Sequence, residues 1–201
     1  MIKFKQNYLK LKLSMKKKMF FITAIISFLF CLSIILYNLF SLPFIFTVAI
    51  TLGTASYHFI MRLLVGHSID AIFKNKVDYE KWWFKEKKFE KGLYKFLKVK
   101  VWKKKMPTFS PHVFSLKDNS LEFILGASCQ AEIVHEVIAV LSFLPIALIP
   151  IFNSPVAFIL TSLLSAVFDL SFAIIQRFNR PRFLSLAKKS DILTNKTQTE
   201  K

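Results

Sequence analysis

The sequence predicts an all-α integral membrane protein, with four transmembrane helices in two hairpins and a cytoplasmic interfacial amphipathic helix. Hydrophobic residues make up 54% of the 201 residues, yet the formal net charge is +17. The apolar residues gather in four long runs, and almost all basic residues lie outside these runs. A soluble domain rarely combines these features, whereas a membrane protein with basic loops does.

Each apolar run is long enough to cross a membrane. The first covers residues 19–40 and carries no charge. At a rise of about 1.5 Å per residue, a helix of this length spans a hydrocarbon core of about 30 Å. Because the run is too long for a signal peptide and no small-residue cleavage site follows, we expect it to be a retained helix. The other runs cover residues 43–65, 133–152 and 155–175.

Very short turns join these runs in pairs. Only Ser41 and Leu42 separate the first run from the second, and only Asn153 and Ser154 separate the third from the fourth. Short connections make consecutive helices antiparallel neighbours. The sequence therefore predicts two helical hairpins.

The distribution of Lys and Arg predicts the orientation. Of the 29 basic residues, seven precede Met19, fourteen lie in residues 66–130, seven follow Gln176, and the short turns contain none. The positive-inside rule then places both termini and the central segment in the cytoplasm, against the anionic leaflet of the cell membrane. The basic residues therefore need no nucleic-acid partner to explain them.

This orientation divides the chain into five segments. They are a basic cytoplasmic tail (1–18), a first transmembrane hairpin (19–65), a cytoplasmic interfacial segment (66–130), a second transmembrane hairpin (131–177) and a second basic cytoplasmic tail (178–201).

Aromatic residues and lysines alternate in residues 78–106. Five apolar residues recur there at helical spacing: Trp82, Phe89, Leu93, Phe96 and Leu97. Such a pattern is typical of an amphipathic helix that lies at the membrane interface. A direct role of this segment in substrate binding is the alternative.

Ionisable residues inside a membrane are costly and usually functional. His58 and Arg62 are four residues apart, so they share one face of the second helix. Asp169 lies about two turns from the expected end of the fourth helix. We expect all three side chains to line a pocket in the cytoplasmic half of the bundle.

Glu132 and His135 lie three residues apart, where the third helix is expected to begin. Their side chains can meet on one face, and the carboxylate can then orient the imidazole as a general base. Two alternatives remain open. Glu132 can simply favour the N-terminal helix dipole, or the pair can ligate a metal, although di-iron proteins need more carboxylates than the chain places here.

Three of the four arginines in the chain lie within six residues: Arg177, Arg180 and Arg182. Arginine is suited to a bidentate grip on phosphate, which lysine cannot provide. We expect the three arginines, with Gln176 and Asn179, to bind a phosphate-bearing ligand. The alternative is positive-inside anchoring, but that role requires only charge.

Four stretches resemble the glycosyl-4,4'-diaponeurosporenoate acyltransferase family of staphyloxanthin-type carotenoid biosynthesis. They are residues 90–94 (Glu-Lys-Gly-Leu-Tyr), residues 99–103 (Val-Lys-Val-Trp-Lys) with Pro107, residues 129–135 (Cys-Gln-Ala-Glu-Ile-Val-His) and residues 176–182 (Gln-Arg-Phe-Asn-Arg-Pro-Arg). The chain departs from the family pattern at three positions. Ala127 replaces an acidic residue, Glu136 an aromatic residue and Asp169 an asparagine. The resemblance implies transfer of a fatty acyl group to a sugar hydroxyl of a glycosylated C30 carotenoid, or of a related glycolipid.

The leading hypothesis is therefore a membrane acyltransferase. His135, oriented by Glu132, would take the proton of the acceptor hydroxyl, and Gln176 or Asn179 would stabilise the oxyanion. The three arginines would hold an acyl donor such as acyl-CoA. This donor is a co-substrate, so no cofactor and no metal are expected. His58, Arg62, Asp169 and Glu90 would line the pocket.

The expected partners are membrane lipids, the acyl donor and the glycosylated acceptor, which would enter from the lipid between the hairpins. Two other classes remain open at this point. One is a membrane methyltransferase or reductase with a cytoplasmic cofactor site, and the other is a non-enzymatic lipid-binding protein.

Overall fold

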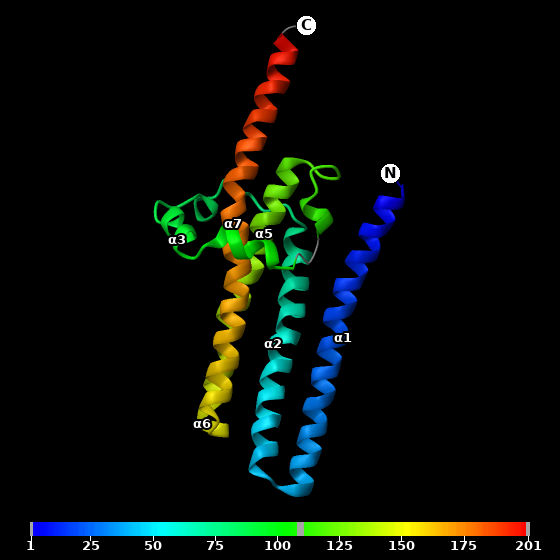
Figure 1. Ribbon diagram of the computed structural model, residues 1–201, viewed down its shortest axis with the longest axis vertical. Coiled ribbons are helices and arrows are strands. Elements are labelled where there is room, and N and C mark those ends of the chain that lie inside the picture. Colours follow the sequence, from blue (N-terminus) through cyan, green and yellow to red (C-terminus); the bar gives the residue numbers. More distant parts are fainter. Residues whose placement is uncertain (1, 108–110, 200–201) are drawn as a thin grey trace. The chain divides into compact units, whose positions relative to one another are not determined.

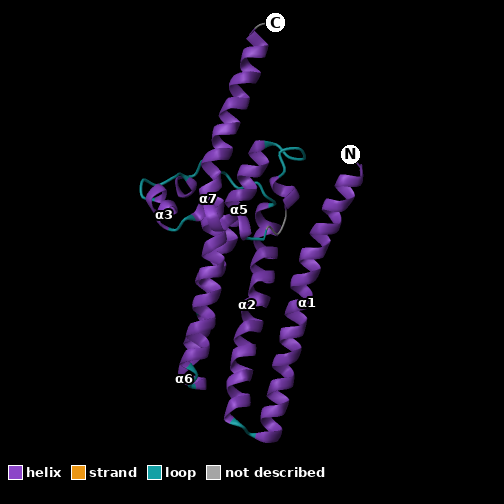
Figure 2. Ribbon diagram, viewed as in Figure 1, coloured by secondary structure: helices purple, strands orange, loops and turns teal. Residues whose placement is uncertain are grey.

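A computed structural model describes residues 2–107 and 111–199, with side chains for residues 17–107 and 112–189. The described residues form helices and connecting loops, and none of them forms a strand (Figure 2). The chain divides into two compact units. We call Met1–Ser68 with Val134–Ser171 the membrane unit, and Ile69–Ile133 with Phe172–Lys201 the basic unit.

Four helical segments of the described chain are long and apolar enough to cross a membrane: Lys17–Phe40, Pro43–Phe73, Leu121–Phe152 and Pro155–Lys189. The helices that carry them are α1 (Ile2–Phe40), α2 (Pro43–Phe73), α5 (Leu121–Leu141) and α7 (Pro155–Thr199). The predicted all-α membrane protein with four spans is confirmed. The third span is interrupted after α5 by η4 (Leu144–Leu148) and completed by α6 (Ile149–Phe152). Pro145 explains the interruption, because a proline ring clashes with the carbonyl four residues before it.

The two predicted turns form within the membrane unit. Ser41 (φ 53°) ends α1 and Asn153 (φ 48°) ends α6, and both adopt the left-handed conformation that stops a helix. Pro43 and Pro155 then begin α2 and α7, where a missing backbone N–H costs nothing. Figure 1 shows α1 and α2 side by side, joined by the first of these turns.

The packing of the membrane unit suits a lipid environment. Many of its large apolar side chains are exposed, including Phe20, Phe28, Phe44 and Val156. Gly53 of α2 lies against the ring of Phe30, since a Cβ there would stand 2.7 Å from Phe30 Cε2. Small residues that let helices approach closely are typical of membrane bundles.

Three helices extend beyond their predicted limits. α2 continues to Phe73, α5 begins at Leu121 rather than near residue 131, and α7 continues through Pro181 to Thr199. Parts of the predicted segments 66–130 and 178–201 therefore belong to long helices. The expectation that Glu132 marks a helix start is wrong, because Glu132 lies well inside α5. The dipole explanation for this carboxylate no longer applies.

The predicted single amphipathic helix over residues 78–106 is also wrong. This segment contains four short helices: η1 (Trp82–Phe84), α3 (Glu90–Phe96), α4 (Val99–Trp102) and η2 (Lys103–Lys105). Lys98, at φ 51°, separates α3 from α4. The segment still has two faces, since Trp82 and Phe96 are exposed whereas Phe84 is buried. A further short helix, η3 (Pro111–Phe114), precedes α5.

The basic unit has a small core, formed by Val77, Phe84 and Cys129 with Tyr79 and Ile133 packed against it. The turn after α2 lies directly on α5. The backbone N–H of Asn75 donates to Gln130 Oε1 at 2.6 Å, and Gln130 Nε2 donates to Asp70 Oδ1 at 3.0 Å. Gly126 permits this approach, because a Cβ there would stand 2.6 Å from the carbonyl oxygen of Asn75.

Gly126→Ala should therefore destabilise the basic unit. The added methyl group meets backbone, which cannot move aside cheaply, and overpacking of this kind costs about 1–3 kcal/mol. Gly92→Ala is the matched control, since a Cβ at Gly92 meets nothing within 4 Å and alanine favours the helix by up to about 1 kcal/mol. Thermal unfolding of purified protein in lipid nanodiscs measures both. Equal midpoints for the two variants would contradict the close packing.

Candidate active site

Polar side chains from separate helices form one cluster in each unit. The membrane cluster consists of Arg62, His135, Ser142, Ser165 and Asp169. The arginine–carboxylate cluster of the basic unit consists of Glu90, Glu132, Arg177 and Arg180.

Asp169 is the centre of the membrane cluster, and its side chain is only 1% exposed. Its Oδ2 accepts hydrogen bonds from Arg62 Nε at 3.0 Å and Nη2 at 2.5 Å. Its Oδ1 lies 3.0 Å from Nδ1 of His135. One buried carboxylate thus links a guanidinium from α2 to an imidazole from α5, and the ion pair with Arg62 offsets the cost of burying its charge.

Arg62 is held on several sides. Its Nη2 donates to Ser165 Oγ at 2.8 Å, and its Nη1 donates to the carbonyl oxygen of His58 at 3.2 Å. Ser165 Oγ in turn lies 2.8 Å from Ser142 Oγ. The predicted pocket residues Arg62 and Asp169 therefore do meet, and they do so with His135.

His58 behaves differently from its neighbour Arg62. Its side chain is buried, with 4% exposure. Within the described part of the chain, neither of its ring nitrogens has a hydrogen-bond partner. Its ring packs edge-on against Tyr57, with centroids 5.3 Å apart. His58 therefore contributes its backbone carbonyl oxygen to the membrane cluster, whereas its side chain lies outside the hydrogen-bond network.

Glu132 is the centre of the arginine–carboxylate cluster and is completely buried. Its Oε1 accepts from Arg177 Nη1 at 2.5 Å, and its Oε2 accepts from Arg180 Nη2. Arg180 is itself buried, donates to the carbonyl oxygen of Phe84 at 3.1 Å and lies over the Phe84 ring. Both oxygens of Glu132 are thus bound by guanidinium groups of α7.

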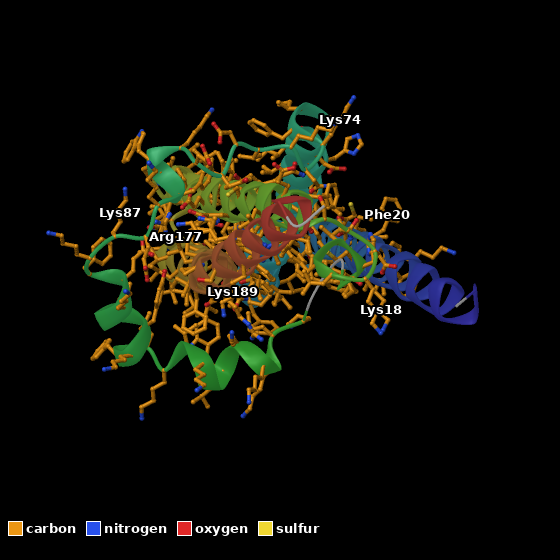
Figure 3. The ribbon with its side chains drawn as sticks, turned by 90° about the horizontal axis from the view of Figure 1, so that it is seen from above. Lys18, Phe20, Lys74, Lys87, Arg177 and Lys189 are labelled. Atoms are coloured by element: carbon orange, nitrogen blue, oxygen red, sulfur yellow. The ribbon has the colours of Figure 1, made fainter. Side chains whose placement is uncertain are left out.

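Glu90 completes the cluster from α3. Its Oε1 accepts from Arg177 Nε at 3.2 Å and Nη2 at 2.5 Å, and its Oε2 accepts from Tyr94 Oη at 2.7 Å. Burial acts to raise the pKa of Glu90, but the hydrogen bonds from Arg177 and Tyr94 outweigh burial and hold this pKa below its usual value. In Figure 3, Arg177 lies among the side chains between α7 and the segment before α3.

The arginine–carboxylate cluster is therefore electrically balanced, with two carboxylates and two guanidiniums. It joins α3, α5 and α7 of the basic unit. Arg177 also donates to the carbonyl oxygen of Trp83 at 3.1 Å. Two of the three arginines that we expected to bind phosphate thus have carboxylates of the protein itself as partners.

The remaining predicted residues of α7 have other partners. Gln176 Oε1 accepts from Ser128 Oγ at 3.2 Å, and Asn179 Oδ1 accepts from Lys103 Nζ at 2.7 Å. Arg182 is exposed. The sequence alone did not single out Lys103, because it is one lysine among many. Its position in the family-like stretch at residues 99–103 was the one feature that could have distinguished it from the other lysines.

A family model for glycosyl-4,4'-diaponeurosporenoate acyltransferase matches residues 80–189, which is more than half of the chain. The chain belongs to this family. No curated protein and no solved structure matches it.

Membership makes the protein an acyltransferase of carotenoid biosynthesis, and its four long apolar helices make it a membrane protein. The predicted enzyme class is confirmed over the methyltransferase, the reductase and the non-enzymatic lipid-binding protein. The matched region includes the whole arginine–carboxylate cluster, together with His135 and Asp169 of the membrane cluster. Arg62 and His58 lie before it.

A hollow of the acyltransferase's basic unit adjoins the arginine–carboxylate cluster. It is lined by Phe84, Glu86, Glu90, Arg177, Arg180, Pro181 and Leu184. Among the side chains that the structure describes, no group of three or more His, Cys, Asp or Glu is arranged to hold a metal ion.

Glu132→Gln should destabilise the acyltransferase strongly. It leaves Arg180 buried without a charged partner, and breaking a buried ion pair from one side costs about 3–5 kcal/mol. Glu122→Gln is the matched control, because Glu122 lies on the same helix but is exposed. Thermal unfolding and limited proteolysis of residues 78–106 measure the effect. A Glu132→Gln protein as stable and as protease-resistant as the control would show that the cluster does not hold the basic unit together.

Proposed function

We propose that this acyltransferase transfers a fatty acyl group to a sugar hydroxyl of a glycosylated carotenoid, with His135 as the general base. The contact between His135 Nδ1 and Asp169 Oδ1, at 3.0 Å, carries the proposal. Family membership supports the reaction class, and this geometry supports the choice of the base.

Asp169 rather than Glu132 is suited to orient the base. When Nδ1–H of a neutral imidazole donates to a carboxylate, Nε2 is the nitrogen that can accept a proton. Arg62 holds the other oxygen of Asp169, which fixes the carboxylate in place. Glu132, by contrast, has both oxygens bound by arginines. The side chain of His135 is 23% exposed, whereas that of Glu132 is completely buried.

The proposed reaction needs no cofactor. Nε2 of His135 takes the proton of the acceptor hydroxyl while the hydroxyl oxygen attacks the acyl carbonyl carbon. With an acyl-CoA donor, a C–O ester bond forms, the C–S bond breaks, and the proton passes to the leaving thiolate. The products are the acylated glycoside and free coenzyme A.

Asparagine, the usual family residue at position 169, is compatible with this role. Its side-chain oxygen also accepts a hydrogen bond from Nδ1–H, as in Cys–His–Asn enzymes. The aspartate of this chain adds a charge, which Arg62 balances. A sugar-bearing carotenoid is largely apolar, so we propose that it reaches His135 from the lipid. We also propose that both termini face the cytoplasm, since the basic residues avoid the two short turns.

His135→Ala should lower kcat by about 10²–10⁴-fold, which is the usual contribution of a general base. The assay measures acyl transfer from acyl-CoA to a glucosylated C30 carotenoid by purified protein in nanodiscs. His67→Ala is the matched control, because His67 is an exposed histidine of α2. Activity of His135→Ala close to that of the control would refute the proposed base.

Asp169→Ala should lower kcat with little change in KM, because it removes the group that orients His135 and not a substrate contact. Asp169→Asn should recover much of the lost kcat, since the amide oxygen can still accept from Nδ1–H. Thermal unfolding is measured in parallel, because both variants remove the charged partner of Arg62. If the two variants lose activity only in proportion to lost folded protein, Asp169 has a structural role and does not position the base.

A further inference from the structure

The arginines predicted to bind phosphate separate into two environments. Arg177 and Arg180 belong to the balanced arginine–carboxylate cluster. Arg182 follows Arg180 by two residues on α7 and is exposed. None of the ion pairs in the described part of the chain includes it. Of these three arginines, Arg182 is therefore the one whose guanidinium is best placed to bind an external anion.

Lys103 of η2 is held in this region by two side chains of α7. Its Nζ donates to Asn179 Oδ1 at 2.7 Å and lies 4.3 Å from the centre of the Phe178 ring. A lysine on an exposed surface usually moves freely. The hydrogen bond and the cation–π contact instead fix this ammonium group at one place.

The contact with Lys103 also determines the orientation of the Asn179 amide. An ammonium group only donates hydrogen bonds, so the atom of Asn179 that faces it must be the oxygen. The NH₂ group of Asn179 then does not face Lys103 and can donate to another acceptor. Asn179 and Arg182 lie three residues apart on α7, so they share one face of the helix, and Lys103 is hydrogen-bonded to Asn179. Each of these three side chains can donate to an anion.

The charges that act on Lys103 are all positive. Burial lowers its pKa, and the nearby charges of Arg182, Lys104 and Lys100 lower it further. Among the described residues, no carboxylate forms an ion pair with Lys103 or Arg182 in the way that Glu90 and Glu132 do with Arg177 and Arg180. A bound anion would relieve this repulsion, and a phosphate group combines negative charge with suitable acceptor oxygens.

We propose that Lys103, Arg182 and the side-chain amide of Asn179 bind a phosphate group of the acyl donor. This inference rests on the proposed acyl transfer and names the donor site. Lys103 supplies a fixed point charge, and Arg182 supplies a bidentate fork. The phosphate belongs either to coenzyme A or to the headgroup of a donor phospholipid, and the experiment separates these two sources.

The first measurement is binding of coenzyme A to the full chain in phosphatidylcholine nanodiscs. Lys103→Met and Arg182→Ala should each weaken binding by about tenfold or more, as expected for loss of one charge-assisted hydrogen bond. Lys105→Met is the matched control, because Lys105 lies in the same short helix, is exposed and is not among the charges that act on Lys103. Thermal unfolding verifies that all the variants are folded.

The second measurement compares acyl-CoA with the acyl thioester of pantetheine, which lacks phosphate. Wild-type protein should prefer acyl-CoA, and Lys103→Met should lower kcat/KM for acyl-CoA alone. A third measurement uses nanodiscs with phosphatidylglycerol that carries a labelled acyl chain, without coenzyme A. Transfer of this label, lost in Lys103→Met and Arg182→Ala, would identify the phospholipid as the donor.

Two outcomes would overturn the site. One is unchanged coenzyme A binding together with unchanged use of the phospholipid donor in both variants. The other is equal kcat/KM of the wild-type protein for the pantetheine thioester and acyl-CoA, together with no use of the phospholipid. This second outcome would overturn the phosphate site but not the proposed acyl transfer. Conversely, tight coenzyme A binding that depends on Lys103, without acyl transfer from any donor, would support the site and refute the proposed reaction.

Discussion

The basic unit depends on the burial of one carboxylate, Glu132. An ionised glutamate without exposure to water is very costly unless cations surround it. Arg177 and Arg180 meet this requirement from a single helix, and Arg177 reaches Glu90 with the same side chain. Since Glu90 lies on α3 and Glu132 on α5, these ion pairs connect three helices of the basic unit. Apolar contacts add to these ion pairs, because Phe84 of η1 packs with Val77 and Cys129, and the ring of Tyr94 packs edge-on against Phe178.

The membrane unit shows the same physical rule with a different outcome. Asp169 is nearly as buried as Glu132, but its two oxygens contact groups of different kinds. Arg62 is always charged, whereas an imidazole can gain and lose a proton near neutral pH. The carboxylate of Asp169 is therefore stabilised by one partner and can still orient the other. A fully ionic network such as that of Glu132 offers no such group, which is why the membrane cluster is the better candidate for proton transfer.

The difference between arginine and lysine explains much of the chain's composition. Each of the four arginines except Arg182 binds a buried carboxylate, and their forked geometry allows one side chain to bind two partners. Most of the lysines described are exposed. Lys103 departs from this pattern, since α7 holds its ammonium group in place. The choice of arginine therefore indicates geometry, as the sequence suggested, and for Arg62, Arg177 and Arg180 the partner is a carboxylate of the protein.

The sequence by itself determined the membrane class, the four spans, the two turns and the family, because hydropathy, proline, asparagine and motif strings are local properties of a chain. It also selected most residues of both clusters, because charges in apolar surroundings are conspicuous. Only the tertiary structure decided the pairings. Glu132 and His135 are three residues apart on one helix, so their spacing suggested that they are partners. In the structure each binds a residue of α7 instead: Glu132 binds Arg177, and His135 binds Asp169. The tertiary structure also showed that α5 begins at Leu121 and carries Gly126 and Gln130 against the turn after α2, a contact between segments that are distant in the sequence.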